Sequence, residues 1–153
     1  MMTFIIIIHW NVMKNNLKFV KVQKNKEHVD VLYNLLKNRN HTISHQTLPN
    51  YSQHEKFVKN HPYRVWFLIE DDGQFIGSVY ILKNNSIGIP NIENAQKNVK
   101  LAIEYIMKKY KPLAAIPSVR SPHFTINVAP DNVELKKAVE AMNTKMIQVT
   151  YAF

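Results

Sequence analysis

Three apolar runs separated by two tight-turn signals fill the middle of the sequence and constrain the fold more than any other feature. The first run is Val65 to Glu70 and the second is Phe75 to Leu82. Asp72-Gly73 stands between them, and this dipeptide favours a turn in which both central residues have positive φ. Asn84-Asn85 marks another turn before a third run, Ser86 to Ile89, which a proline ends. The pattern predicts a three-stranded antiparallel meander.

Helical periodicity flanks the meander on both sides. Apolar residues at helical spacing predict a helix capped by Asn25 and ending near Asn38. The segment Ser52 to Glu55 has the form of a capping box and predicts a short helix that His61-Pro62 ends. The best periodic segment runs from about Asn94 to Tyr110 and predicts the longest helix.

Shorter patterns complete the order of elements. We expect strands at Leu17–Val22, His123–Val128 and Met146–Phe153, a helix at Asp131–Met142, and an irregular proline-containing segment over 111–122. Strands and helices therefore alternate irregularly around the meander. The sequence predicts an α/β (α+β) fold: a central mixed, mostly antiparallel sheet with helices on both faces.

The length of 153 residues suits one domain. We expect residues 14–153 to form it and residues 1–13 to be a leader or an extra edge strand. The apolar run from Phe4 to Ile8 has no basic residue before it and is shorter than the core of a signal peptide. No apolar run approaches the ~18 residues of a membrane span. We therefore expect a cytoplasmic protein, either a monomer or a homodimer.

Composition excludes several classes of function. The chain has no cysteine, which rules out disulfides, thiol nucleophiles and cysteine metal sites. Three glycines are too few for a dinucleotide fingerprint or a P-loop. His41 and His45 have no carboxylate at ligand spacing, so no metal site is expected. The net charge is +9, but the lysines are scattered and there are only three arginines, which argues against nucleic acid as the main partner.

Two stretches resemble the GNAT superfamily of N-acetyltransferases. Ile76-Gly77-Ser78-Val79-Tyr80-Ile81, a turn and Ser86-Ile87-Gly88-Ile89 look like the third and fourth strands of that family. Asn127-Val128-Ala129-Pro130-Asp131-Asn132 looks like its fifth strand and the start of its fourth helix. The resemblance extends over residues 17–153.

The resemblance implies a function and a site for acetyl-CoA. Acetyl-CoA would lie between the fourth and fifth strands, with its pantetheine chain along the fourth and its pyrophosphate at the start of the following helix. The reaction would be direct attack of a primary amine on the thioester, and the acceptor an amino sugar, a small amine or a peptide amine. The residues carried over for acetyl-CoA are Ile87, Gly88, Ile89, Asn94, Ala95, Gln96, Lys97, Asn98, Val99, Asn127 and Asn132.

The chain departs from the family in two places. Asn94, Lys97 and Val99 stand where the pyrophosphate loop normally has Gln or Arg and two small residues. We expect Val99 to crowd the approach of backbone to phosphate. Val139 stands where a tyrosine often protonates the leaving thiolate. The alternative function is therefore a catalytically degenerate module that keeps the fold and binds a ligand.

Candidates for the remaining roles come from the position of each residue in the expected fold. His45, Glu70 and Tyr151 are candidate catalytic groups. His45 or Glu70 could take the proton that the amine must lose, and Tyr151 could act as an acid. His45, Tyr51 and His54 are candidates for acceptor binding, since the segment between the first two helices shapes the acceptor pocket in the family.

Overall fold

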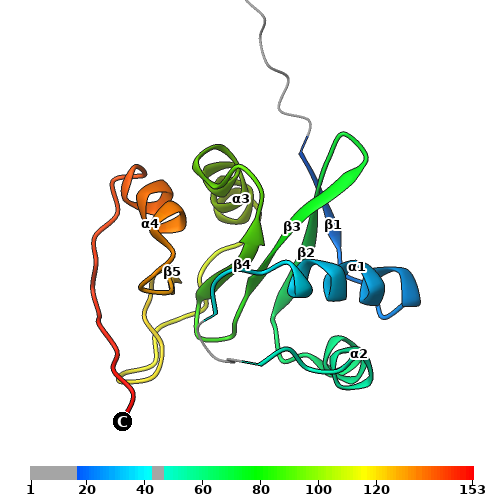
Figure 1. Ribbon diagram of the computed structural model, residues 1–153. Helices are drawn as coiled ribbons and strands as arrows, with labels where there is room; N and C mark the ends of the chain where they lie inside the picture. Colours follow the sequence, from blue (N-terminus) through cyan, green and yellow to red (C-terminus); the bar gives the residue numbers. More distant parts are fainter. Residues whose placement is uncertain (1–16, 43–46) are drawn as a thin grey trace, which may run out of the picture.

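A five-stranded sheet forms the centre of the protein in the computed structural model, which describes residues 17–42 and 47–153 (Figure 1). The strands follow one another across the sheet in chain order, and only the last pair, β4 with β5, is parallel. The strands are β1 (Lys18–Lys21), β2 (Val65–Asp71), β3 (Gln74–Ile81), β4 (Ser86–Ile92) and β5 (Thr125–Ile126). This confirms the predicted mixed, mostly antiparallel sheet.

Both turns of the meander have the backbone that the sequence predicts. Asp72 and Gly73 have φ of 48° and 80° in the β2–β3 turn. Asn85 has φ of 69° in the β3–β4 turn, a conformation that Asn tolerates better than most residues. The two turns hold β2, β3 and β4 in consecutive antiparallel register.

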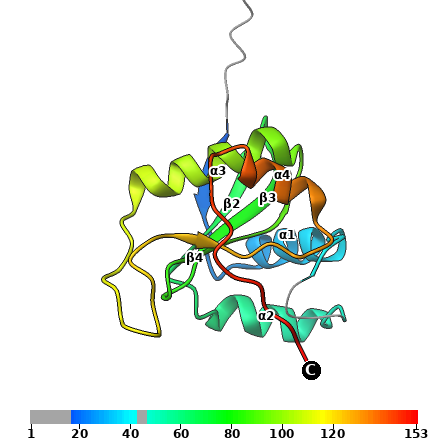
Figure 2. The ribbon, with the colours of Figure 1, turned by 90° about the vertical axis from the view of Figure 1, so that its left-hand side faces the viewer.

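Four helices cover the two faces of the sheet. Alternate residues of β2 point to opposite faces. Trp66 and Leu68 pack with α1 and α2, whereas Phe67 and Ile69 pack with α3 and α4. Figure 2 shows the sheet between these two pairs of helices. The helices are α1 (Lys26–Lys37), α2 (Tyr51–Asn60), α3 (Ala95–Lys109) and α4 (Val133–Glu140).

Asn85 ties the irregular segment over 111–122 to the sheet. Its side chain is fully buried; the amide nitrogen donates to the carbonyls of Leu113 (2.9 Å) and Ser121 (2.8 Å), and its oxygen accepts from the N–H of Leu113 (2.8 Å). Its carbonyl also accepts from the N–H of Thr125 at 3.1 Å. One asparagine therefore determines where β5 joins β4.

Four local expectations are wrong. Pro90 does not end the third strand of the meander, because it lies in an irregularity of register where a missing N–H is tolerated. The capping box of the second helix consists of Asn50 and Gln53, so it begins two residues before the expected box of Ser52 and Glu55. The strand expected at His123–Val128 is reduced to Thr125–Ile126, because the chain then leaves β4. No strand forms over Met146–Phe153, whose side chains are exposed.

The expectations for residues 1–13 lie outside the described residues. The C-terminal segment runs down the β5 side of the molecule in Figure 1, where β5 is too short to offer it a regular edge. No helix within residues 17–42 and 47–153 is long and apolar enough to cross a membrane.

Candidate functional site

The parallel strands β4 and β5 separate after two paired positions. Ser86 pairs with Thr125 and Ile87 with Ile126, and β4 then continues to Ile92 without a partner on that side. A cavity of about 650 Å³ opens at the divergence. Its lining from this region comprises Ile87, Gly88, Ile89, Pro90, Asn91, Asn127, Ala129, Asn132 and Leu135.

A β-bulge shapes the part of β4 that borders the cavity. Tyr80 pairs with Gly88 and Ser78 with Asn91, so β4 has one residue more than β3 over this stretch. A bulge bends its strand and interrupts the ladder of hydrogen bonds. Pro90 is accommodated there, and β4 turns along the cavity wall.

The ring of Tyr80 lies directly over Gly88. A Cβ at position 88 would come within 2.0 Å of Tyr80 Cζ and 2.4 Å of its hydroxyl oxygen. Only glycine leaves room for this ring, so Gly88 is needed for packing and not for a positive φ. The contact holds the Tyr80 hydroxyl beside the cavity-lining part of β4.

Aromatic side chains from α2, from the segment between α2 and β2, and from β2 and β3 form another wall of the cavity. Tyr63 and Tyr80 stack at 4.0 Å between ring centroids, and Trp66 packs edge-on against Tyr63 at 4.9 Å. Phe57 of α2 packs edge-on against both Tyr63 and Trp66. We call Phe57, Tyr63, Trp66 and Tyr80 the aromatic wall; all four line the cavity.

The two tyrosines of this wall keep their protons at neutral pH. Burial raises the pKa of Tyr63, and the neighbouring Tyr80 adds to the rise. Burial likewise raises the pKa of Tyr80. The positive charge of Arg39 acts in the opposite direction on both but is a smaller influence. Both hydroxyls therefore keep their protons at neutral pH.

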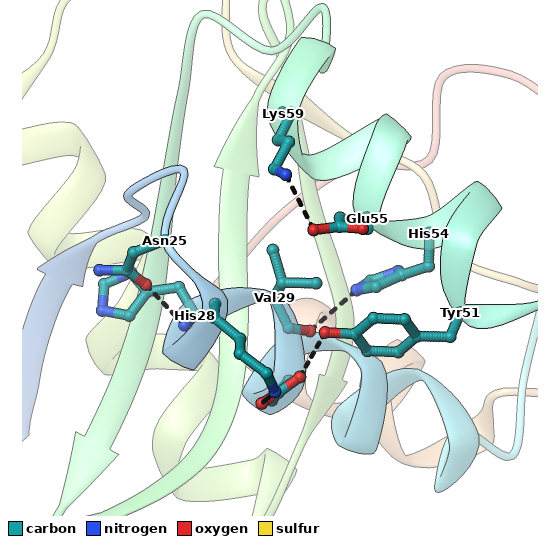
Figure 3. Close-up of polar contacts among 9 residues, drawn as sticks. Asn25, His28, Val29, Tyr51, His54, Glu55 and Lys59 are labelled. Atoms are coloured by element: carbon teal, nitrogen blue, oxygen red, sulfur yellow. Dashed lines mark hydrogen bonds and ion pairs between the residues drawn. The ribbon is translucent and has the colours of Figure 1, made fainter.

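His54 of α2 lines the cavity and is held in place by α1. Its Nε2 donates to the carbonyl of Val29 at 3.1 Å, as Figure 3 shows. Burial lowers the pKa of this imidazole, because the charged form loses hydration. His54 is therefore neutral near pH 7, and its hydrogen bond connects α2 to α1 on this side of the cavity.

The first turn of α3 follows β4 after Glu93 and Asn94. Asn94 is left-handed, with φ of 49°, and its side chain does not cap the helix. No described residue accepts from the backbone N–H of Ala95 or Gln96. The Asn98 amide donates to the Glu93 carbonyl at 2.8 Å and steadies the connection.

The structure corrects the expectation for Val99. Its side chain is fully buried in the core between α3 and the sheet. It does not project from the start of the helix, so it does not crowd the free amides there. The left-handed residue that a glycine would normally supply is Asn94.

The residues expected to bind acetyl-CoA fall into two groups. Ile87, Gly88, Ile89, Asn127 and Asn132 line the cavity. The run from Asn94 to Val99 forms the connection and first turns of α3 and is not part of the cavity lining. The two groups are joined by the short stretch of chain from Asn91 to Glu93.

The expected catalytic and acceptor-binding residues are not brought together. Glu70 pairs with Lys18 at 2.9 Å between β2 and β1, away from the cavity lining. Tyr151 is exposed in the C-terminal segment. Tyr51 donates its hydroxyl to Asp30, again outside the cavity lining (Figure 3). His54 lines the cavity, and His45 lies outside the described residues.

Sequence reasoning missed the residues that give the cavity its chemistry. Arg39 and the aromatic wall line it, but they come from four separate places in the chain. Their spacing has no motif, and Trp66 and Tyr80 look like ordinary strand residues. Arg39 had one local signal: it follows directly on the helix whose apolar side also lines the cavity.

Several solved structures have the same fold as this chain. No family model matches the chain, and no curated protein matches its sequence. A possible acetyltransferase from Clostridium difficile 630 superposes with a TM-score of 0.54 at 12% identity, over 90% of this chain and 96% of that one. The spermidine/spermine N-acetyltransferase SpeG from Vibrio cholerae, in mutant forms, superposes with a TM-score of 0.51 at 18% identity, over 82% and 77%.

A third solved structure has the same architecture. It is an aminoglycoside acetyltransferase, meta-AAC0020, from an uncultured soil metagenomic sample, in complex with sisomicin. Its TM-score is 0.50 at 14% identity, over 90% of this chain and 94% of that chain. The chain therefore has the fold of the GNAT N-acetyltransferases, in a divergent form. The fold resemblance read from the sequence is confirmed.

Proposed function

We propose that this protein transfers the acetyl group of acetyl-CoA to a primary amine. The observation that carries the proposal is the cavity where β4 and β5 diverge. Beyond Ile87, the outer edge of β4 has backbone groups without a strand partner. An extended pantetheine chain, with its two amides, can pair with such an edge as an added strand.

The start of α3 supplies what the pyrophosphate of acetyl-CoA requires. Free backbone N–H groups and the helix dipole favour an anion at this position. Ala95 and Gln96 offer such groups, and no side chain of the cap competes for them. Lys97 and Lys100 are exposed on the same part of the helix and add positive charge.

The chemistry required of the chain is modest. The amine nitrogen attacks the thioester carbonyl carbon and the carbon–sulfur bond breaks. The proton lost by the amine passes through water to the departing thiolate, so the products are the amide and free CoA. We assign Tyr80 as the group that donates a hydrogen bond to the departing sulfur. Its hydroxyl keeps its proton and is held over Gly88 of β4. Tyr80 would thus take the role of the tyrosine that the family often has in α4, where this chain has Val139.

Calorimetric titration with acetyl-CoA, compared with free CoA at low and moderate salt, tests the proposal. We expect saturable binding at micromolar concentration that weakens with salt, because lysines and a helix terminus bind the phosphates. An Asn127→Trp variant should block the cavity, since Asn127 is exposed at its lining. Asn34→Trp, on the exposed side of α1, is the matched control. No binding at millimolar acetyl-CoA would contradict the proposal.

The second candidate is a ligand-binding module without turnover. It is favoured by Asn94 and Lys97 in place of the usual pyrophosphate loop and by Val139 in place of a tyrosine. The neighbours whose acceptors are named act on spermidine and spermine or on an aminoglycoside, and those classes form the first acceptor panel. If the protein binds acetyl-CoA but releases no CoA with any of the amines tested, the ligand-binding module is the correct function.

A further inference from the structure

We propose that the acceptor is a small monoamine that carries an anionic group, and that Arg39 binds this group. The inference rests on the proposed acetyl transfer and names its substrate class. It is argued from three properties of the cavity: an arginine without a partner, a lining without carboxylates, and the aromatic wall.

Arg39 differs from the other two arginines of the chain. The Arg64 side chain donates to the carbonyl of Lys111, and Arg120 donates to the carbonyls of Ala114 and Lys83. Within residues 17–42 and 47–153, no ion pair or hydrogen bond is made by the Arg39 guanidinium, although it is half-buried and lines the cavity. A guanidinium in this setting gains most from an anion that it can bind with two parallel hydrogen bonds.

No carboxylate lines the cavity. All 11 acidic residues of the sequence lie in the part of the chain that the structure describes, and none belongs to the lining. Three acidic residues, Glu55, Asp131 and Glu134, are next to lining residues in the chain. Asp131 and Glu134 are exposed; Asp131 pairs with His41 at 3.0 Å, and Glu55 pairs with Lys59 at 2.8 Å. Among the described residues of the lining, Arg39 is thus the one with a permanent charge.

This balance of charge disfavours polycationic acceptors. A polyamine or an aminoglycoside brings several ammonium groups, and each loses hydration on entering a cavity. Carboxylates normally compensate for that loss, whereas here the guanidinium of Arg39 repels the incoming charges. The net charge of +9 also slows the approach of polycations and favours anions.

The aromatic wall and the volume describe the rest of the acceptor. The rings of Phe57, Tyr63, Trp66 and Tyr80 offer apolar surface and two protonated hydroxyls. One ammonium group can rest against such rings before it loses its proton. The space of about 650 Å³ must also hold the acetyl end of the cofactor, so the acceptor is small. An aromatic amino acid has the required combination of groups.

Matched acceptor pairs that differ by one anionic group test the inference. Phenylalanine is compared with phenethylamine, and phosphoethanolamine with ethanolamine, with spermidine and kanamycin as polycations; CoA release is followed with a thiol reagent. We expect kcat/KM to favour the anionic member at least about tenfold, which corresponds to one charge-assisted hydrogen-bonded pair. The better pair shows whether the anion is a carboxylate or a phosphate.

Variants at Arg39 assign the preference to this residue. Arg39→Gln should bring the ratio within each pair close to one, and Arg39→Lys should keep part of it. Lys37→Gln is the matched control, because Lys37 is exposed at the end of α1, two residues before Arg39, and lies outside the cavity lining. Urea unfolding of each variant separates loss of fold from loss of preference. A ratio unchanged by Arg39→Gln, or polycations used as well as anionic amines, would overturn the inference while leaving acetyl transfer intact.

A binding measurement separates this inference from the proposed function. In a Trp10→Phe protein, Trp66 of the aromatic wall is the sole tryptophan, and its fluorescence reports occupancy of the cavity. Binding of phenylalanine or phosphoethanolamine that Arg39→Gln abolishes, without acetyl transfer, would support the anion site and reject the enzyme. Equal binding of each matched pair would reject the anion site.

Discussion

The two faces of the sheet differ in what their helices cover. On the face of α3 and α4, mostly aliphatic side chains from the strands and helices form one continuous buried cluster, with Phe67 among them. On the face of α1 and α2, the buried cluster is smaller, and the aromatic wall borders a cavity. The first face has almost only apolar contacts. The second has the buried His54 and Arg39, whose guanidinium has no ion pair or hydrogen bond with any residue that the structure describes.

The difference separates stability from ligand binding. Aliphatic packing stabilises a fold in proportion to the area that it buries. A face that contains a cavity buries less apolar area and is stabilised less, but the polar groups in the cavity wall can bind a ligand. Changes on the α3–α4 face should therefore lower the free energy of unfolding, and changes on the α1–α2 face should mainly alter binding.

Asn85→Ala should have the largest effect, because Asn85 connects the segment over 111–122 and the start of β5 to the sheet. The substitution removes three side-chain hydrogen bonds and places alanine at positive φ. We expect unfolding to cost about 4 kcal/mol less, at roughly 1 kcal/mol for each lost bond and for the strain. Chemical denaturation measures the loss. Asn85→Gly should recover about 1 kcal/mol, since glycine accepts the backbone conformation. Equal values for the two variants would mean that strain plays no part.

Ile106→Ala should affect one face alone. Ile106 of α3 is fully buried in the aliphatic cluster, so its truncation should destabilise the protein by about 3 kcal/mol. Met107, the next residue, is 55% exposed, and Met107→Ala should change stability by less than about 0.5 kcal/mol. Ligand affinity measured well below the unfolding transition should be unchanged in both. Weakened binding in Ile106→Ala would show that the faces are coupled.

Gly88→Ala tests the position of Tyr80 on the cavity face. The added Cβ must displace the Tyr80 ring, which should cost about 1–3 kcal/mol of stability and reduce acetyl-CoA affinity. In a Tyr80→Ala background the same substitution should cost less than about 0.5 kcal/mol, because the clash is gone. A double-mutant cycle by urea unfolding and calorimetry measures this coupling. Additive effects would refute the contact.

The smallest expected effect is a dependence of stability on pH from His54. Burial holds its pKa below the ordinary value of 6.5, so the unfolded chain binds a proton more readily than the native one. This contribution is complete above pH 6.5 and is lost as the pH falls from there through the lowered pKa. Burial and the nearby Lys24 lower the pKa of His61 as well, which adds to the same slope.

Urea midpoints between pH 7.5 and 5 measure this slope. His54→Gln should flatten it, because the amide cannot gain a charge. The exposed His123→Gln is the control and should keep the wild-type slope. A slope that His54→Gln leaves unchanged would locate the titration elsewhere in the chain.

Much of the fold could be predicted because its signals are local. The Asp72-Gly73 turn, the alternation along β2 and β3, and the periodicity of α1 and α3 each lie within a short stretch of chain. The site could not be predicted in the same way. Glu70 pairs with Lys18 of the neighbouring strand, and Val99 turns into the core; both outcomes depend on partners remote in sequence.

The C-terminal segment shows where local sequence signals stop being sufficient to predict the structure. Its β-prone residues predict a strand over Met146–Phe153, but a strand needs an edge, and β5 ends after two residues. The sequence by itself determined the meander, the helices and the resemblance to an acetyltransferase fold, since turns and periodicity act between near neighbours. The resemblance also implied a site between β4 and β5, where the structure has the cavity. The tertiary structure alone decided that Tyr80 rests on Gly88 and that Arg39 faces a cavity without carboxylates. These features depend on backbone divergence and long-range packing, which bring together residues that no spacing rule connects.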